Sequence, residues 1–355
     1  MTLLHRLSRG LGLFPAKAPA PAGPPVRPAQ DLVVILDGTM STLAPGGETN
    51  AGLIYKLLRD RQAPGLAVFY EAGLQWDSWR DGLDMMRGVG INRQIQRAYH
   101  FLAARYRPGD RIWLFGYSRG AFAVRSLAGL IDRVGLLRAC FATERHVQLA
   151  YRHYQCDPHA GPSQAFARRF CYLHTEIEMV GVFDTVKALG LRLPMLWRLT
   201  ERSHSFHSHH LGNKICHGYH ALALNETRAA YAPELWEATE DWPGHVEQVW
   251  FRGSHGDIGG QLCGFPDARP LSNIPLSWML GRAEACGLEL PDGWRARFPC
   301  DVDAPSSGSW RGWARLFLLR GRRRPGGDPS ERLHPTAQGT RAARRFDLPI
   351  AGAEI

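Results

Sequence analysis

The sequence predicts an α/β fold: a mostly parallel sheet with helices on both faces and a helical or loop cap. Three observations lead to this prediction. Short apolar runs rich in β-branched residues recur between turn signals, as in DLVVILDGT at 31–39. Segments of about 15 residues with a helical apolar period alternate with these runs. A Gly-x-Ser-x-Gly pattern at 116–120 joins one such run to one such helical segment.

Each predicted element has its own signal in the sequence. The run at 31–39 is continuously apolar, which indicates a strand buried on both faces, as in a parallel sheet. A helix expected at 90–106 ends at a Pro-Gly-Asp stop signal, and one expected at 272–287 ends at a glycine. Further strands are expected at 67–70, 111–117, 179–183 and 246–251, and a further helix at 121–137.

The same pattern suggests how the chain is divided. Residues 1–30 end in a Pro/Ala-rich stretch and are expected to be disordered. Residues 31–304 form the α/β domain, and the stretches near 140–175 and 188–216 are expected to cap its site, because long insertions in α/β enzymes usually do so. Residues 305–355 are expected to be a basic extension, partly packed on the domain.

The net charge of +10 is concentrated at the two ends of the chain. Residues 1–30 carry +4, residues 311–345 carry +8 and residues 346–355 carry −2, which leaves residues 31–310 neutral. A nucleic-acid-binding core would carry its own basic face, so no nucleic-acid partner is expected. The stretch WRGWARLFLLRGRRR at 310–324 fits either a helix lying on anionic lipid or, as favoured, a helix packed on the body with solvated arginines.

The cysteines and the hydropathy of the sequence indicate the cellular compartment of the protein. The seven cysteines form no C-x-x-C pair, which favours free thiols in a reducing compartment over disulfides or a zinc site. No segment has 18 consecutive apolar residues, and the first residues lack a signal-peptide core. We expect a cytoplasmic protein, with peripheral membrane attachment or export without a signal peptide left open.

The most informative pattern is Gly116-Tyr-Ser-Arg-Gly120, which lies between a predicted strand and a predicted helix. This context is what a nucleophile elbow requires. Ser118 would occupy a strained backbone corner, and the sharp turn demands glycine at both Gly116 and Gly120. The candidate nucleophile is therefore Ser118.

A serine nucleophile needs a general base, and position selects one of the fifteen histidines. His255 lies in a Gly-rich loop after the strand at 246–251, where the functional groups of open α/β sheets gather. A second group of histidines at 204–210 lacks such a context and is interpreted as a solvated or substrate-facing loop rather than a metal site. No metal or cofactor is expected.

The orienting acid is expected to be Asp184, which directly follows the predicted strand at 179–183. The next predicted strand along the chain, at 246–251, leads to His255. Asp257 competes because it is two residues from His255, but a short aspartate in a glycine loop more often bonds local backbone. The backbone N–H groups of Arg119 and of Gly38 or Thr39 are expected to form an oxyanion hole.

Asp37 opens an Asp-Gly-Thr sequence after the first strand. Phosphatases that form an aspartyl phosphate carry a nucleophilic carboxylate two residues earlier, where this chain has Ile35. Aspartyl-phosphate chemistry is therefore excluded, and Asp37 is expected to support the loop or the elbow.

The assembled motifs resemble a known family, an uncharacterised group of α/β hydrolases that includes the catalytic domain of type VI secretion phospholipase effectors. The resemblance spans roughly 31–341 and implies a Ser-Asp-His hydrolase of esters, lipids being the best-known substrates, with Ser118, Asp184 and His255 in those roles. The matching stretches are LDGT (36–39), the Gly-Val-Gly-Ile stretch (88–91) before AYHFLAARYRPGD (98–110), LFGYSRGAFAVRSLAGLI (114–131), VGVFDTVKALG (180–190), HALALNETR (220–228), VWFRGSHGDIGG (249–260), LSNIPLSWML (271–280) and LHPTAQGTR (333–341).

The function expected from the sequence is therefore hydrolysis of carboxylic esters, plausibly lipid acyl esters, through an acyl-enzyme. Two alternatives stay open: a non-catalytic binding or effector-accessory module that keeps the fold as a scaffold, and acyl transfer to an alcohol in place of water. The expected partners are an ester or lipid substrate and, through the basic and aromatic tail, a membrane surface.

Overall fold

A single seven-stranded sheet organises the chain, and all of its strand pairs are parallel. The computed structural model describes residues 27–61, 63–73, 89–156, 160–172, 174–186, 211–238, 242–311 and 317–352. The strand order is β2-β1-β3-β4-β5-β6-β7. The strands are β1 (Asp31–Leu36), β2 (Leu66–Glu71), β3 (Arg111–Tyr117), β4 (Ile177–Phe183), β5 (Ile215–Ala223), β6 (His245–Phe251) and β7 (Glu331–Leu333).

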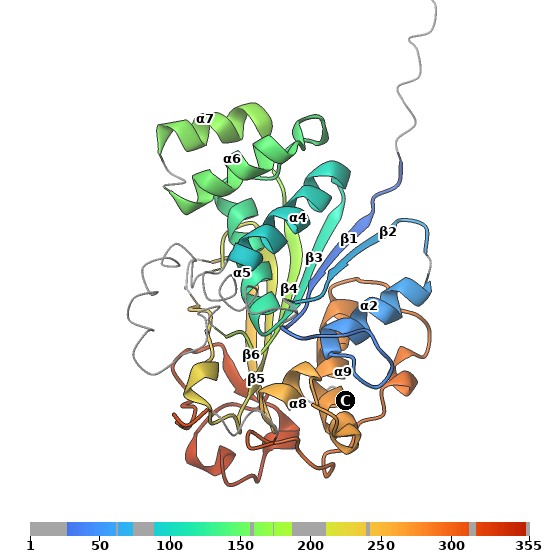
Figure 1. Cartoon of the computed structure of the whole chain (residues 1–355), viewed down its shortest axis with the longest axis vertical. Coiled ribbons are helices and arrows are strands. Elements are labelled where there is room, and N and C mark those ends of the chain that lie inside the picture. The colour runs from blue at the N-terminus through green and yellow to red at the C-terminus, as the bar shows by residue number, and fades with distance from the viewer. Residues whose placement is uncertain are drawn as a thin grey trace, which may run out of the picture.

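Helices cover both faces of this sheet (Figure 1). The helices are α2 (Asn50–Arg61), α4 (Val89–Arg105), α5 (Arg119–Arg133), α6 (Glu144–Gln155), α7 (Gly161–Phe170), α8 (His255–Gly259) and α9 (Arg269–Ala285). Alternate residues of β1 separate the two layers. Leu32 and Val34 belong to a core shared with α4, α5 and α6, whereas Val33 and Ile35 belong to a core shared with α2 and α9. The predicted α/β class is therefore correct.

Two strands were not expected from the sequence. β5 has the sequence ICHGYHALA, whose two histidines and glycine hide a strand that is buried over most of its length. It lies between β4 and β6, so the strands that carry Asp184 and His255 are not neighbours in the sheet. β7 has only three residues and pairs with β6.

The position of β7 corrects the expected division of the chain. The sheet continues to Leu333, so the fold does not end at residue 304, and the C-terminal stretch is an integral part of it. Residues 317–324 contain no helix, unlike either alternative considered for this stretch. Residues 312–316, the N-terminal residues 1–26 and most of the second expected cap, 187–210, lie outside the described residues.

The first expected cap is placed differently from the prediction. Its described residues include the helices α6 and α7, and α6 packs against α4 and α5. Figure 1 shows α6 and α7 at the end of the molecule opposite to α8. Since parallel strands all end on the side where α8 begins, these two helices do not cover the carboxyl edge of the sheet. Insertion length predicted an extra subdomain here but not the edge at which it lies.

Candidate active site

Ser118 occupies a sharp corner between β3 and α5. Its backbone has φ 57° and ψ −117°, a conformation that non-glycine residues rarely adopt. A Cβ at Gly116 would lie 2.7 Å from the Cα of Ala121, and one at Gly120 would lie 2.1 Å from the carbonyl oxygen of Leu36. Both glycines are therefore required by close backbone contacts, as the sequence pattern predicted.

His255 and Asp184 come to this corner from two other segments. His255 begins α8 directly after β6, and Asp184 follows β4 with a positive φ of 42°. The Nε2 atom of His255 lies 2.9 Å from the Oγ of Ser118, and its Nδ1 atom lies 2.6 Å from the Oδ2 of Asp184. All three side chains are buried. The structure thus brings the three expected residues into one hydrogen-bonded chain.

Asp257 has a different set of partners. Its Oδ2 accepts hydrogen bonds from the backbone N–H of Ser254 at 2.7 Å and from its hydroxyl at 2.8 Å, and its Oδ1 accepts one from the N–H of Ser307 at 2.7 Å. The bond from the Ser254 N–H is one half of a capping box at the start of α8, whose other half is the Asp257 N–H donating to the Ser254 side chain. Asp257 therefore fixes the loop that carries His255, and the His255 ring bonds to Asp184.

Asp184 also has a partner that the sequence did not reveal. The guanidinium of Arg323 binds both of its carboxylate oxygens, with Nη2 2.8 Å from Oδ2. The backbone N–H of Ala223 donates to Oδ1 at 2.9 Å. Burial by itself would raise the pKa of Asp184, but the charge of Arg323 and the hydrogen bond from His255 hold this pKa far below its usual range. The carboxyl is accordingly ionised.

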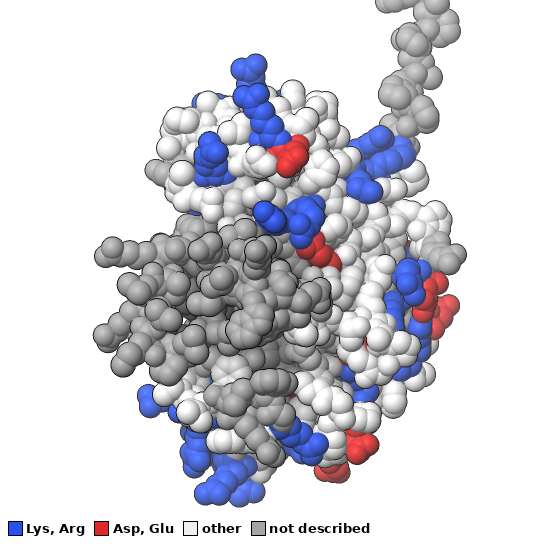
Figure 2. Space-filling view, in the orientation of Figure 1, with Lys and Arg blue, Asp and Glu red and all other residues white. Residues whose placement is uncertain are grey.

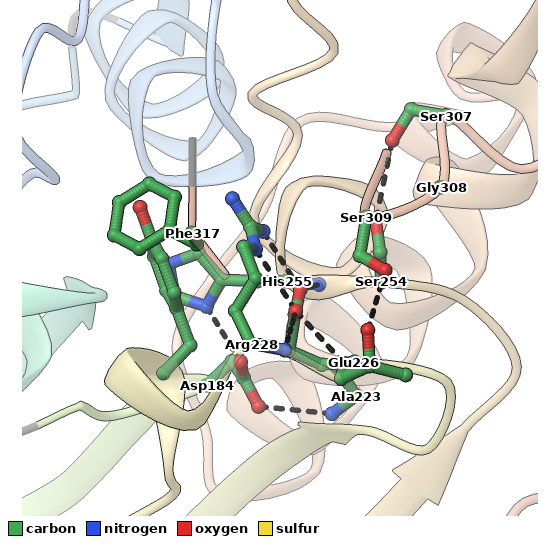
Figure 3. A network of polar contacts seen from close by, with 12 residues as sticks. Asp184, Ala223, Glu226, Arg228, Ser254, His255, Ser307, Gly308, Ser309 and Phe317 are labelled. Atoms are coloured by element: carbon green, nitrogen blue, oxygen red, sulfur yellow. Dashed lines mark hydrogen bonds and ion pairs between the residues drawn. The ribbon is translucent and has the colours of Figure 1, made fainter. Parts of the chain in front are cut away.

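The His255 ring is held from several sides (Figure 3). It lies between two tyrosine rings, with centroids 5.0 Å away for Tyr117 and 4.7 Å away for Tyr231. Its backbone N–H donates to Glu226 Oε2 at 3.1 Å. Burial lowers the pKa of His255, and the hydrogen bond and charge of Asp184 oppose that shift. The free imidazole is therefore the favoured form near neutral pH.

Glu226 forms a second buried ion pair beside the histidine. Its Oε2 lies 2.7 Å from Nη2 of Arg228, and its Oε1 accepts from the backbone N–H groups of Thr227 and Arg228. Burial raises the pKa of Glu226, but the bonds to Arg228 outweigh it and lower the pKa to about 2. The Arg228 guanidinium lies over the Tyr231 ring, 3.9 Å from its centroid. Each charge of this pair is thus compensated within the site.

The loop that carries Gly38 and Thr39, two of the expected oxyanion donors, approaches Ser118 at Gly38. A Cβ at Gly38 would stand 3.5 Å from the Cβ of Ser118, which places the loop after β1 against the corner. The N–H of Gly38, however, already donates to Asp37 Oδ1 at 2.6 Å. Among the described residues, the N–H groups of Thr39 and Arg119 have no hydrogen-bond partner, so these two are the available donors.

Asp37 holds the loop that carries Gly38 and Thr39. Besides the Gly38 N–H, it accepts hydrogen bonds from the hydroxyls of Thr49 at 2.6 Å and Tyr70 at 2.8 Å. Burial raises the pKa of Asp37, and these neutral donors lower it only in part. The supporting position expected for Asp37 fits these contacts.

The side chain of Arg119 is distinct from the other arginines near the site. It makes no hydrogen bond or ion pair with any residue that the structure describes, and burial lowers its pKa to about 10. Its charge acts on the nearby Tyr231 hydroxyl, beside the His255 ring. Arg119 is thus a positive charge at the edge of the site that no described residue compensates through an ion pair.

Sequence reasoning missed Arg323, Glu226, Arg228 and Tyr231. The last three lie within or just after the HALALNETR stretch, which was noted as a motif without a role for its charged residues. The histidines at 204–210 lie outside the described residues.

Fold and site together define an α/β protein with a buried serine, histidine and aspartate in hydrogen-bonded sequence at the carboxyl edge of its sheet. The family model described as the catalytic domain of Tle1-like type VI secretion phospholipase effectors matches residues 30–282. The chain belongs to this family, and this confirms the predicted resemblance.

Individual relatives are more distant. An uncharacterised protein of Saccharomyces cerevisiae, YEL023C, is 28% identical over 228 residues, which cover 57% of this chain and 32% of that protein. A crystal structure of an uncharacterised protein from Pseudomonas aeruginosa matches with TM-score 0.45 and 17% identity, over 77% of this chain and 49% of that one. A Tle1 effector bound to the VgrG spike of the type VI secretion system matches with TM-score 0.37 and 19% identity, over 66% and 52%. The chain spans about a third to a half of the length of these relatives.

Proposed function

We propose that this protein is a serine hydrolase that cleaves carboxylic esters of lipids, with Ser118 as nucleophile, His255 as general base and Asp184 as the acid that orients it. The observation that carries this proposal is the continuous hydrogen-bonded chain from the Ser118 hydroxyl through both ring nitrogens of His255 to Asp184. Membership of a phospholipase effector family supports the lipid class of substrate.

The geometry supports the following steps. The Oγ of Ser118 attacks the ester carbonyl carbon while Nε2 of His255 takes its proton. The N–H groups of Arg119 and Thr39 stabilise the oxyanion that forms. His255 then gives the proton to the leaving alcohol oxygen as the carbon–oxygen bond breaks, which leaves an acyl group on Ser118. A water molecule, deprotonated by His255, cleaves this acyl-enzyme and regenerates the serine.

The positive φ of Ser118 supports its assignment as a nucleophile elbow, which would serve the first step. It presents the hydroxyl at the N-terminus of α5, where free N–H groups and the helix dipole favour negative charge. Burial of His255 keeps its imidazole in the unprotonated form that the attack requires.

We also propose that the C-terminal segment contacts a membrane surface. Trp310, Leu318 and Leu319 are large apolar side chains with 59%, 84% and 60% of their surface exposed. Leu318 and Leu319 directly follow Phe317, whose ring centroid lies 5.4 Å from that of Tyr231 beside the site. Figure 2 shows Lys and Arg side chains gathered at the lower edge of the molecule, where the C-terminal segment lies in Figure 1. Exposed apolar groups among cations fit an anionic lipid surface. Among the described residues, no helix is long and apolar enough to cross a bilayer.

The experiment that tests the proposal compares three forms of the purified protein on phospholipid vesicles and on a short aryl ester. Ser118→Ala should lower turnover on both substrates at least about a thousandfold. The control is Ser126→Ala, which removes a serine hydroxyl inside α5, the helix that Ser118 precedes; this hydroxyl donates to the carbonyl of Phe122. This variant should keep nearly the wild-type rate. Undiminished hydrolysis by the Ser118 variant would rule out the mechanism, and an inactive wild-type protein would favour the binding-module alternative.

A further inference from the structure

A buried arginine from the last part of the chain is built into the site. Arg323 belongs to the segment that leads to β7, 41 positions beyond residue 282, where the family match ends. Its side chain is only 4% exposed, and both of its terminal nitrogens are bonded to Asp184. This contact joins two residues that are 139 positions apart in the sequence.

The hydrogen bonds of Asp184 are fully occupied, and both terminal nitrogens of Arg323 take part in them. Asp184 accepts from His255, from Arg323 at both oxygens and from the N–H of Ala223, which occupies its four acceptor positions. Arg323 also donates to the carbonyl oxygen of Ala223 at 2.9 Å and to that of Tyr231 at 2.6 Å. One guanidinium therefore links the acid, the end of β5 and the turn that carries the Tyr231 ring against His255. Such a clamp leaves Asp184 one orientation.

The same contact changes the electrostatics that His255 experiences. In a Ser-His-Asp arrangement, the charge of the aspartate stabilises the imidazolium. Here Nη2 of Arg323 and Nδ1 of His255 share the Oδ2 atom of Asp184, so the carboxylate charge is divided between two cations when His255 is protonated. An adjacent positive charge disfavours protonation of the imidazole.

The other groups that face His255 do not offset this effect. Glu226 and Arg228 form their own ion pair, so their charges largely cancel, and the two tyrosines are neutral because burial raises their pKa values. In the part of the chain that the structure describes, the titratable and charged groups around the ring are Asp184 after β4, Arg323 before β7, Glu226 and Arg228 after β5, Tyr231 next to them, Tyr117 on β3, Arg119 on α5 and Asp257 on α8.

We propose that Arg323 is a positioning residue of this site, which clamps Asp184 and neutralises its charge so that His255 stays unprotonated, and able to act as a base, at lower pH. The inference rests on the proposed function for the meaning of His255 as a base, but the contact itself and its effect on the histidine can be measured without substrate. It also implies that the matched family segment needs the C-terminal stretch to complete its site.

The direct test is titration of His255 by nuclear magnetic resonance in the full-length protein labelled with ¹³C-histidine, its signal assigned by its loss in His255→Gln. Arg323→Gln should raise the titration midpoint of His255 by about one pH unit. Arg323→Lys, which keeps the charge but loses the two-pronged contact, should raise it by less. Arg320→Gln is the matched control, because Arg320 lies three residues away and bonds to Thr227 and Ser309 instead of Asp184. It should leave the midpoint unchanged.

The outcomes separate this inference from the proposed function. A folded Arg323→Gln protein whose His255 titrates at the wild-type midpoint, or below it, overturns the inference. If that variant does not fold, Arg323→Lys decides in the same way. If the variant is active, the acidic limb of its kcat/KM profile should shift to higher pH by the same amount as the His255 midpoint. Loss of folded protein alone would lower the plateau of kcat/KM without shifting the limb. A wild-type protein without esterase activity would refute the proposed function and leave the titration test of Arg323 intact.

Discussion

Two buried aspartates, Asp37 after β1 and Asp184 after β4, show how differently one residue type can be used at the same edge of a sheet. Neither is more than 1% exposed. Asp184 is bonded to a guanidinium and an imidazole, and its pKa is depressed. Asp37 is bonded to a backbone N–H and to neutral hydroxyls, and its pKa is raised. Both carboxyls are buried, so their hydrogen-bond partners decide whether the pKa is lowered, as at Asp184, or raised, as at Asp37.

The largest effect is expected from removing the charge of Asp184, which tests whether this aspartate and Asp37 have different roles. Asp184→Asn should lower kcat about ten-thousandfold, as the equivalent change does in the Ser-His-Asp template, because His255 would adopt the wrong tautomer. Steady-state kinetics on a short aryl ester measures this directly. A loss of less than about tenfold in a folded variant would mean that Asp184 does not orient the base.

The matching change at Asp37 should act on stability instead. Asp37→Asn places an amide among these hydrogen-bond donors and should cost about 1–3 kcal/mol of unfolding free energy, with kcat reduced only modestly. Because the pKa of Asp37 is raised in the folded state, its contribution is fully present below about pH 4, the ordinary aspartate value, and declines as pH rises through the folded-state pKa. The cost of Asp37→Asn should therefore shrink as pH increases from 4.

The depressed pKa of Asp184 gives the opposite dependence. Its contribution to stability is present above its unfolded-state pKa and is lost as pH falls below that value. The stability cost of Asp184→Asn should thus be constant from pH 5 to 8. Urea unfolding of both variants and the wild type across that range tests the contrast, and parallel pH profiles for the two variants would contradict it.

Arg119 extends the comparison to a charge with no partner among the described residues. If its guanidinium meets an anionic group of the lipid, Arg119→Gln should lower kcat/KM on an anionic phospholipid about tenfold and leave a neutral aryl ester nearly unaffected. The ratio of the two kcat/KM values is the measurement. Equal losses on both substrates would indicate a general effect on the Ser118 corner.

The smallest effect is expected at the exposed apolar side chains. The double change Leu318→Ser and Leu319→Ser should weaken sedimentation with anionic vesicles about fivefold without changing hydrolysis of the soluble ester. Val302→Ser, at another exposed apolar residue of the surface, is the control. Unchanged vesicle binding by the double variant would exclude this segment as the membrane contact.

The site could be predicted from the sequence where local geometry demands particular residues. The Ser118 corner requires two glycines within five positions, and His255 and Asp184 each follow a recognisable strand. The three residues converge because parallel strands end at one edge. These three residues could be predicted because each is marked by a short local sequence pattern.

Arg323 could not be found in this way. It lies in a run of three consecutive arginines, Arg322 to Arg324, and nothing in their composition distinguishes the one whose partner is 139 positions away. β5 was missed because histidines and a glycine break its apolar run, although the strand is central in the sheet. The helices of residues 140–175 were expected, but their place in the molecule depends on their packing against α4 and α5.

The central claim is that Ser118 is a nucleophile activated by His255. It is tested most directly by mass-spectrometric mapping after treatment of the full-length protein with a fluorophosphonate. The account predicts a single adduct on Ser118 that forms rapidly in the wild type and far more slowly in His255→Gln and Asp184→Asn. An adduct on another residue, or equally fast labelling of all three forms, would contradict it.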